Sequence, residues 1–212
     1  MKPLKYFLMI TFVMLLGACS NTKVLSSWKS PGVNPDNLGM KKIIVSVLLP
    51  EQDRPLKKDM EQTLADDLRD RGINAVTADK FYGPKYVPDN ETEAVDKLRA
   101  SRIDGFLTVV LLDQSKQDSY NPGYSQFQPI GYYKSLFGYY KTVFDRVNTQ
   151  GYYATKNKYY WESNLFRVQG EKLIYSGRSD GFDTASINKD AMGYCSKLMT
   201  DMTNQRLISG KQ

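Results

Sequence analysis

Histidine is absent from this chain of 212 residues, and cysteine occurs only twice. Without histidine there is no Ser-His-Asp or Cys-His catalytic arrangement and no metal site built on imidazole. Two cysteines are too few for a zinc site made of thiolates. The sequence also lacks a glycine-rich phosphate loop of the P-loop or dinucleotide-binding type. We therefore expect no catalytic residues, no cofactor and no metal, and we predict that the protein is not an enzyme.

Long blocks of one charge sign are missing as well. The 29 lysines and arginines are interspersed with 23 aspartates and glutamates, which leaves a formal net charge of +6. Nucleic acid is therefore not an expected partner, because its recognition usually draws on massed basic residues. A mildly basic surface favours anionic partners, such as the head groups of envelope lipids.

The beginning of the chain has the pattern of a secretory signal. Two lysines precede an apolar run from Tyr6 to Leu16. This run is shorter than the roughly 20 apolar residues that a membrane-spanning helix requires. A charged start, a short apolar core and small residues at its end are typical of a signal peptide.

The end of this leader, Leu16-Gly17-Ala18-Cys19, resembles the lipobox of bacterial lipoproteins. The resemblance implies that residues 1–18 are removed and that Cys19 carries lipid on its sulfur and a fatty acyl chain, such as palmitate, on its amine. Several acyl chains give a stable membrane anchor. Ser20 follows, where an aspartate would resemble the inner-membrane retention signal. The same resemblance therefore implies the outer membrane, facing the periplasm, with exposure on the cell surface as the alternative.

Residues 19–40 are rich in asparagine, serine, proline and glycine, and we interpret them as a lipidated tether before an α/β domain at 41–212. Trp28 stands out in this segment. It is predicted to be a strand residue that packs on the domain. A partner contact or an anchor at the membrane interface is the alternative.

The first half of the domain predicts a parallel βαβαβ unit. Apolar runs at 42–49, 73–78 and 106–112 are typical of buried strands. Amphipathic helices are predicted at 56–68 and 91–102, between these runs. Strands that alternate with helices in this way form parallel sheets through right-handed crossovers.

The end of the chain predicts an antiparallel addition to the sheet. Residues 159–168 and 173–175 flank a turn at Gln169-Gly170, which is the pattern of a β-hairpin. A final helix is predicted at 187–208, with Cys195 on its apolar stripe. Cys195 is interpreted as a buried small hydrophobic residue, with a reactive thiol as the alternative. The fold class is thus α/β: one domain, a mixed sheet with a parallel βαβαβ half, an antiparallel hairpin and a C-terminal helix.

Ten of the 15 tyrosines fall between residues 120 and 160, often in pairs beside glycine. We interpret residues 120–150 as a long exposed insertion without a helix core, since loops of this length are often functional or disordered. Tyrosine suits contacts with proteins or glycans because its ring is flat and carries a hydroxyl. The predicted partner-binding residues are Trp28, Tyr124, Tyr132, Tyr133, Tyr139 and Tyr140. The alternatives are a merely tolerated loop and aromatic residues that cover the sheet.

Taken in order, the lipobox, Ser26-Ser27-Trp28-Lys29, the strand Ile43-Ile44-Val45, the late aromatic hairpin and the closing helix resemble small Gram-negative lipoproteins of unknown function. The order of elements is also similar to that of the TolB amino-terminal domain and of curli-secretion lipoproteins. The resemblance implies a lipid-anchored, non-catalytic envelope module that binds a protein, peptidoglycan or another glycan, in assembly or maintenance. The alternatives are a subunit of an oligomeric secretion or pore-type complex and a histidine-free envelope hydrolase.

Overall fold

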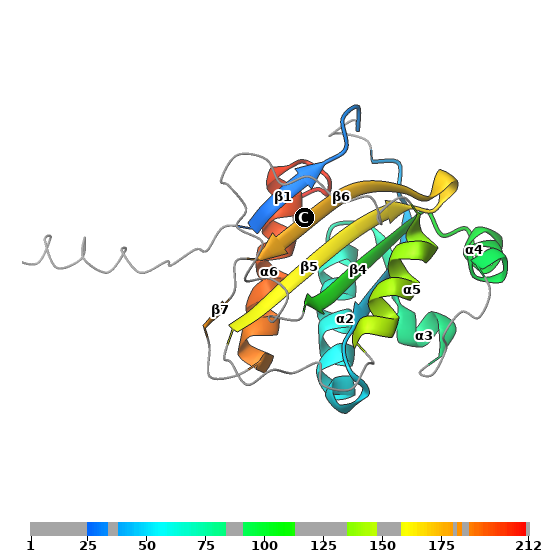
Figure 1. Ribbon diagram of the computed structural model, residues 1–212. Helices are drawn as coiled ribbons and strands as arrows, with labels where there is room; N and C mark the ends of the chain where they lie inside the picture. The colour runs from blue at the N-terminus through cyan, green and yellow to red at the C-terminus, as the bar shows by residue number, and fades with distance from the viewer. Residues whose placement is uncertain are drawn as a thin grey trace, which may run out of the picture.

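A mixed β-sheet with helices on both faces forms the body of the protein (Figure 1). The computed structural model describes residues 25–33, 38–83, 91–112, 135–147, 158–179, 182–183 and 187–210. The main strands lie in the order β1-β6-β5-β4-β2-β3. None of the helices in these ranges combines the length and the apolar character that crossing a bilayer requires.

The parallel half contains β2 (Lys42–Leu48), β3 (Asn74–Thr77) and β4 (Gly105–Leu112). β2 lies between the other two strands and runs parallel to both. Helices α2 (Arg54–Arg69) and α4 (Glu91–Ala100) connect them in sequence, so the predicted βαβαβ unit is confirmed. All eight residues of β4 are buried, as the continuous apolar run predicted.

Helix α2 shows how local pattern positions an element. Its apolar residues recur every four positions and are buried on one stripe. After the helix, the backbone N–H of Ile73 donates to Leu68 O at 3.0 Å, and Gly72 adopts a φ of +81°. Glycine is favoured in this left-handed position because it has no Cβ. The chain therefore turns sharply from α2 into β3. A short helix, α3 (Ala78–Tyr82), then follows β3.

The antiparallel half contains β5 (Lys158–Arg167) and β6 (Lys172–Ser179), which form the predicted hairpin. β6 pairs on its other side with β1 (Leu25–Lys29). Residues within the expected tether are therefore the edge strand of the sheet. A two-residue strand, β7 (Phe182–Asp183), pairs with the beginning of β5. The 3-10 helices η1 (Glu51–Asp53) and η4 (Gln169–Glu171) lie at the ends of the adjoining elements.

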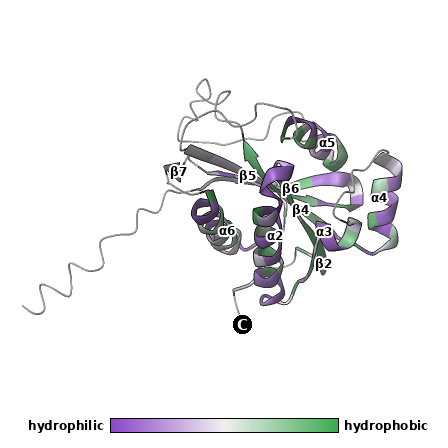
Figure 2. Ribbon diagram, turned by 90° about the horizontal axis from the view of Figure 1, so that it is seen from below, coloured by the Kyte–Doolittle hydropathy of each residue, from purple (hydrophilic) through white to green (hydrophobic). Residues whose placement is uncertain are grey.

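The two faces of the sheet are covered by different helices (Figure 2). α2 and α6 (Ile187–Asn204) cover one face, and α6 bonds to β5 through Trp161 and Ser163. Cys195 in α6 is 1% exposed, which confirms its interpretation as a buried residue. Burial raises the pKa of the Cys195 thiol to about 12, so a reactive thiolate at neutral pH is not favoured.

The opposite face is covered by α5 (Leu136–Val147), which lies inside the stretch expected to be an exposed insertion without a helix. That expectation is wrong for residues 136–147. Apolar side chains at 136, 139, 143 and 147 follow a helical period and are buried against the sheet. The remainder of the predicted insertion lies outside the described residues.

Candidate functional site

The residues predicted to contact the membrane or a partner divide into two groups. Cys19, Tyr124, Tyr132 and Tyr133 lie outside the described residues. Trp28, Tyr139 and Tyr140 lie within them, and the structure places each in a different setting.

Trp28 lies on the edge strand β1, half-buried, opposite Ser176 of β6. Its neighbour Ser27 accepts a hydrogen bond from Gln205, which follows α6. Because successive side chains of a strand point to opposite faces, Trp28 lies on the face that carries α5. It is a strand residue, as predicted, and its half-buried ring retains exposed area.

Tyr139 is 0% exposed, so the expectation that it is an exposed partner contact is wrong. Its hydroxyl donates to Oε1 of Glu162 at 2.9 Å, and its ring lies 5.6 Å from the ring of Phe166. Burial and the neighbouring Glu162 carboxylate raise the pKa of Tyr139 well above its ordinary value. Tyr139 is a core residue because a buried acceptor satisfies its hydroxyl.

Tyr140, one position along α5, is half-buried and belongs to a cluster of aromatic rings. It packs edge-on against Phe106 at 5.9 Å and stacks on Phe144 at 6.2 Å. With Tyr82 and Phe137 it lines a small apolar cavity of about 30 Å³ between α3, α4 and α5. We call the half-buried rings of Phe81, Tyr82, Phe137, Tyr140 and Phe144 the aromatic patch.

Lys97 of α4 adds a positive charge to the aromatic patch. Its ammonium nitrogen lies 5.4 Å from the ring centre of Phe81 and 5.0 Å from that of Tyr82. A cation over aromatic faces is stabilised by the ring quadrupole. The patch therefore offers flat apolar area together with one basic group, a combination that suits a protein or glycan surface.

A buried polar network lies beside the patch, under α5. The Glu162 carboxylate is 1% exposed and accepts hydrogen bonds from Tyr139 and from Asn164 Nδ2 at 3.1 Å. Arg178 of β6 forms an ion pair with its other oxygen. With these donors around it, the carboxylate is held as an acceptor that joins α5 to β5 and β6.

Four buried polar residues lie side by side on the same face of the sheet, one on each of the neighbouring strands β2, β4, β5 and β6. They are Ser46, Thr108, Asn164 and Ser176. We call these four residues the polar row. Thr108 donates to the Asn164 carbonyl at 3.2 Å. Within the described part of the chain, Ser46 Oγ, Asn164 Oδ1 and Ser176 Oγ have no hydrogen-bond partner. Buried polar atoms of this kind usually bind ordered water.

Burial is the main cause that raises the pKa of the Glu61 carboxyl group in α2. Its two oxygens accept the backbone N–H groups of Val47 at 3.0 Å and Asp79 at 3.2 Å. Glu61 therefore joins α2 to β2 and α3, and its side chain is 0% exposed. Among the residues that the structure describes, no three Cys, Asp or Glu side chains are grouped so as to hold a metal ion.

For Trp28 and Tyr140 the partner contact stays a prediction, and sequence reasoning missed the polar row and the Glu162–Arg178 pair. The four residues of the polar row come from four strands, and only the strand register brings them together. A local signal existed for α5, in the spacing of its apolar positions. No local signal marked the pairing of Glu162 with Arg178.

No family model matches the chain, and no curated protein matches its sequence. Solved structures that match include a point variant of the PelC dodecamer from Paraburkholderia phytofirmans. It has 11% identity and a TM-score of 0.43, covering 86% of this chain and 98% of that one. A second PelC dodecamer from the same organism has 11% identity and a TM-score of 0.42, with 86% and 96% covered. TolB from Acinetobacter baumannii has 11% identity and a TM-score of 0.36, with 85% and 31% covered. At these values the matches identify neither a family nor a function.

Proposed function

We propose that the protein is a lipid-anchored module of the bacterial envelope that faces the periplasm from the outer membrane and binds an envelope partner without catalysing a reaction. The lipobox-like residues before Cys19, and the serine that follows it, support the anchor and its destination. The aromatic patch supports the binding role.

The observation that carries this proposal is the short distance along the chain between Cys19 and the folded body. β1 begins at Leu25 and is hydrogen-bonded to β6, so only residues 20–24 separate it from Cys19. Such a segment reaches at most about 20 Å when fully extended. Lipid on Cys19 would therefore hold the β1 edge of the sheet close to the membrane surface. This geometry favours a partner that is itself at the membrane or in the adjacent cell-wall layer.

The aromatic patch and Trp28 lie on the same side of the sheet, the side that carries α5. Half-buried rings on one side give flat apolar area that is already held in place by packing. Lys97 supplies a charge for an anionic or carbonyl-rich partner. We infer that this side contacts an envelope protein or a glycan strand such as peptidoglycan.

The anchor is tested by labelling cells with radioactive palmitate. We expect label in the natural chain, which should fractionate with the outer membrane. The Cys19→Ala variant should carry no label and should appear in the soluble fraction. An unlabelled natural chain, or the same fractionation for both proteins, would contradict the anchor.

The binding surface is tested by photocrosslinking in cells. A photoreactive residue at position 137, in the aromatic patch, is compared with one at the exposed position 200 of α6. Position 200 is the matched control because α6 covers the opposite face of the sheet (Figure 2). We expect a discrete crosslinked species from position 137 and none from position 200. Equal crosslinking, or none from either site, would argue against the aromatic patch as the contact surface.

A further inference from the structure

A cleft of about 500 Å³ lies at the end of the molecule where β2 and β3 begin. One wall is formed by residues 38–41, which lead into β2, and the other by residues 203–210 at the end of α6. Its volume is within the range of sites that hold small molecules. The aromatic patch lies elsewhere, around α3, α4 and α5, so this cleft is separate from the proposed partner surface.

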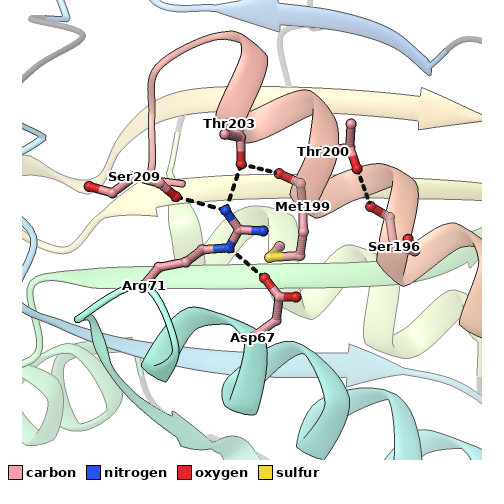
Figure 3. Close-up of polar contacts among 7 residues, drawn as sticks. All are labelled: Asp67, Arg71, Ser196, Met199, Thr200, Thr203 and Ser209. Carbon is pink, nitrogen blue, oxygen red and sulfur yellow. Dashed lines mark hydrogen bonds and ion pairs between the residues drawn. The ribbon is translucent and has the colours of Figure 1, made fainter. Parts of the chain in front are cut away.

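The walls of the cleft are fixed by hydrogen bonds from residues behind them. Arg71, at the end of α2, donates to Thr203 Oγ1 at 2.9 Å and to the Ser209 carbonyl at 2.7 Å (Figure 3). Its Nε bonds to Asp67 at 2.5 Å. On the other side, Arg167 donates to the Leu38 carbonyl at 2.9 Å. The cleft is therefore already formed in the free protein, a property that lowers the cost of binding.

The surface of the cleft has two chemical parts. Leu38, Met40, Leu207 and Ile208 are each less than 9% exposed and give it a small apolar floor, while the larger part of the exposed lining is polar. Among the described lining residues, Lys41 and Arg206 are the charged ones, and both side chains are exposed at its rim. Two positive charges beside an apolar floor are complementary to an anion that carries an apolar group.

The backbone at Arg206 has a conformation that glycine usually occupies. Arg206 has a φ of +57°, in the left-handed region, directly after α6. The N–H of Leu207 donates to Met202 O at 2.9 Å, which is the hydrogen-bond pattern that usually places glycine at the left-handed position. Gly72 occupies the equivalent position after α2. A side chain there is unfavourable for stability, so a glycine at position 206 should relieve this cost while it removes the charge.

We propose that this cleft binds a phosphate monoester with a short apolar substituent, with the phosphate between Arg206 and Lys41 and the substituent on the apolar floor. A phosphate monoester carries about −1.5 to −2 charges at neutral pH, which matches the two cations. Arginine also suits phosphate because its planar donors bind two oxygens at once. The source of this chemistry is either a soluble phosphate ester or the head group of a lipid such as phosphatidic acid.

The test uses the full lipidated chain in phosphatidylcholine nanodiscs and titrates it with butyl phosphate by calorimetry. We expect saturable binding that is weaker for inorganic phosphate, which leaves the apolar floor uncovered. Arg206→Gly should weaken butyl phosphate binding by about tenfold or more, while raising the Tm by about 2–4 °C because glycine relieves the left-handed backbone.

Arg102→Gly is the matched control. Arg102 has a φ of +53° after α4, where the N–H of Ile103 donates to Leu98 O in the same pattern. This variant should gain thermal stability in the same way and should bind butyl phosphate like the natural chain. Lys41→Gln is a second variant on the cleft, and it should also weaken binding.

The source of the phosphate is distinguished by repeating the titration in nanodiscs that contain phosphatidic acid. Loss of butyl phosphate binding there identifies the lipid head group as a competing ligand, and unchanged binding identifies a soluble ester. Either result supports the proposal. The absence of binding in phosphatidylcholine nanodiscs would overturn it. Unchanged binding by Arg206→Gly, or equal affinity for inorganic phosphate and butyl phosphate, would overturn it as well.

Discussion

Arg178→Met removes the cation that faces the most deeply buried carboxylate of the sheet. Glu162 is 1% exposed, and the side chain of Arg178 is 10% exposed. Removing one partner of a buried ion pair costs about 3–5 kcal/mol, because the other charge stays buried without compensation. Tyr139 and Asn164 donate to Glu162 at 2.9 and 3.1 Å in the natural chain, and the variant keeps both donors. We therefore expect the lower end of this range, a loss of about 3 kcal/mol in the free energy of unfolding.

The double variant Glu162→Gln with Arg178→Met separates the charge from the packing. It removes both charges, so the uncompensated carboxylate disappears while the volumes are nearly kept. We expect the double variant to be more stable than Arg178→Met alone by about 1–3 kcal/mol, because residues of one network are not additive.

The assay is urea unfolding followed by tryptophan fluorescence. Trp161 is a suitable probe because it is 0% exposed and its ring stacks on Tyr194 at 5.6 Å. Arg99→Met is the control, since Arg99 and Asp96 form an exposed pair at 3.6 Å. Exposed pairs contribute about 0–1 kcal/mol, so this control should change little. The reasoning fails if Arg178→Met lowers the free energy of unfolding no more than Arg99→Met does. It also fails if the loss in the double variant equals the sum of the losses measured for Glu162→Gln and Arg178→Met separately.

Three further predictions concern stability and are measured by urea or thermal unfolding. Burial raises the pKa of Glu61 above 4.5, so the folded state holds the proton of the Glu61 carboxyl group more tightly than the unfolded chain does. The contribution of Glu61 to the stability of the fold therefore falls as the pH rises above 4.5. The free energy of unfolding of the natural chain, minus that of Glu61→Gln, should therefore be larger at pH 5 than at pH 7. An equal difference at the two pH values would contradict this prediction. Gly177→Ala should lower the free energy of unfolding by about 1–3 kcal/mol, because the new Cβ would collide with the Tyr175 hydroxyl group. Gly193→Ala, in α6, should instead raise the free energy of unfolding by about 0.5–1 kcal/mol, because no heavy atom lies within 4 Å of the new Cβ and alanine favours the helix. If Gly177→Ala were the more stable of the two variants, the packing argument would be refuted.

The parallel half could be predicted because its signals are local. The apolar runs of β2 and β4 contain enough consecutive buried positions to indicate strands covered on both faces. The spacing by four in α2 indicates one buried stripe. Each of these patterns is complete within a dozen residues, so no knowledge of distant partners was needed.

The edge strand β1 could not be assigned with the same certainty, because its pairing is not local. Leu25–Lys29 lies between segments rich in asparagine, serine, proline and glycine, and its partner is β6. Trp28 was the sole hint of a strand there. Composition gave no indication of which edge of the sheet this strand would join.

Tyr139 illustrates a different failure, in which residue type outweighed spacing. A stretch rich in tyrosine and glycine was interpreted as exposed, although Leu136, Tyr139, Val143 and Val147 had a helical period. Burial of the tyrosine depends on the acceptor Glu162, which comes from a strand later in the chain. Such a partner cannot be inferred from the helix alone.

The pairing of β1 with β6 has a consequence for how the chain is made. Synthesis begins at the N-terminus, so residues 25–29 leave the ribosome long before their partner at 172–179. Until then the first strand has unsatisfied backbone groups and is open to pairing with other chains. The β1 edge of the sheet can therefore be completed only after the partner strand near the other end of the chain has been made.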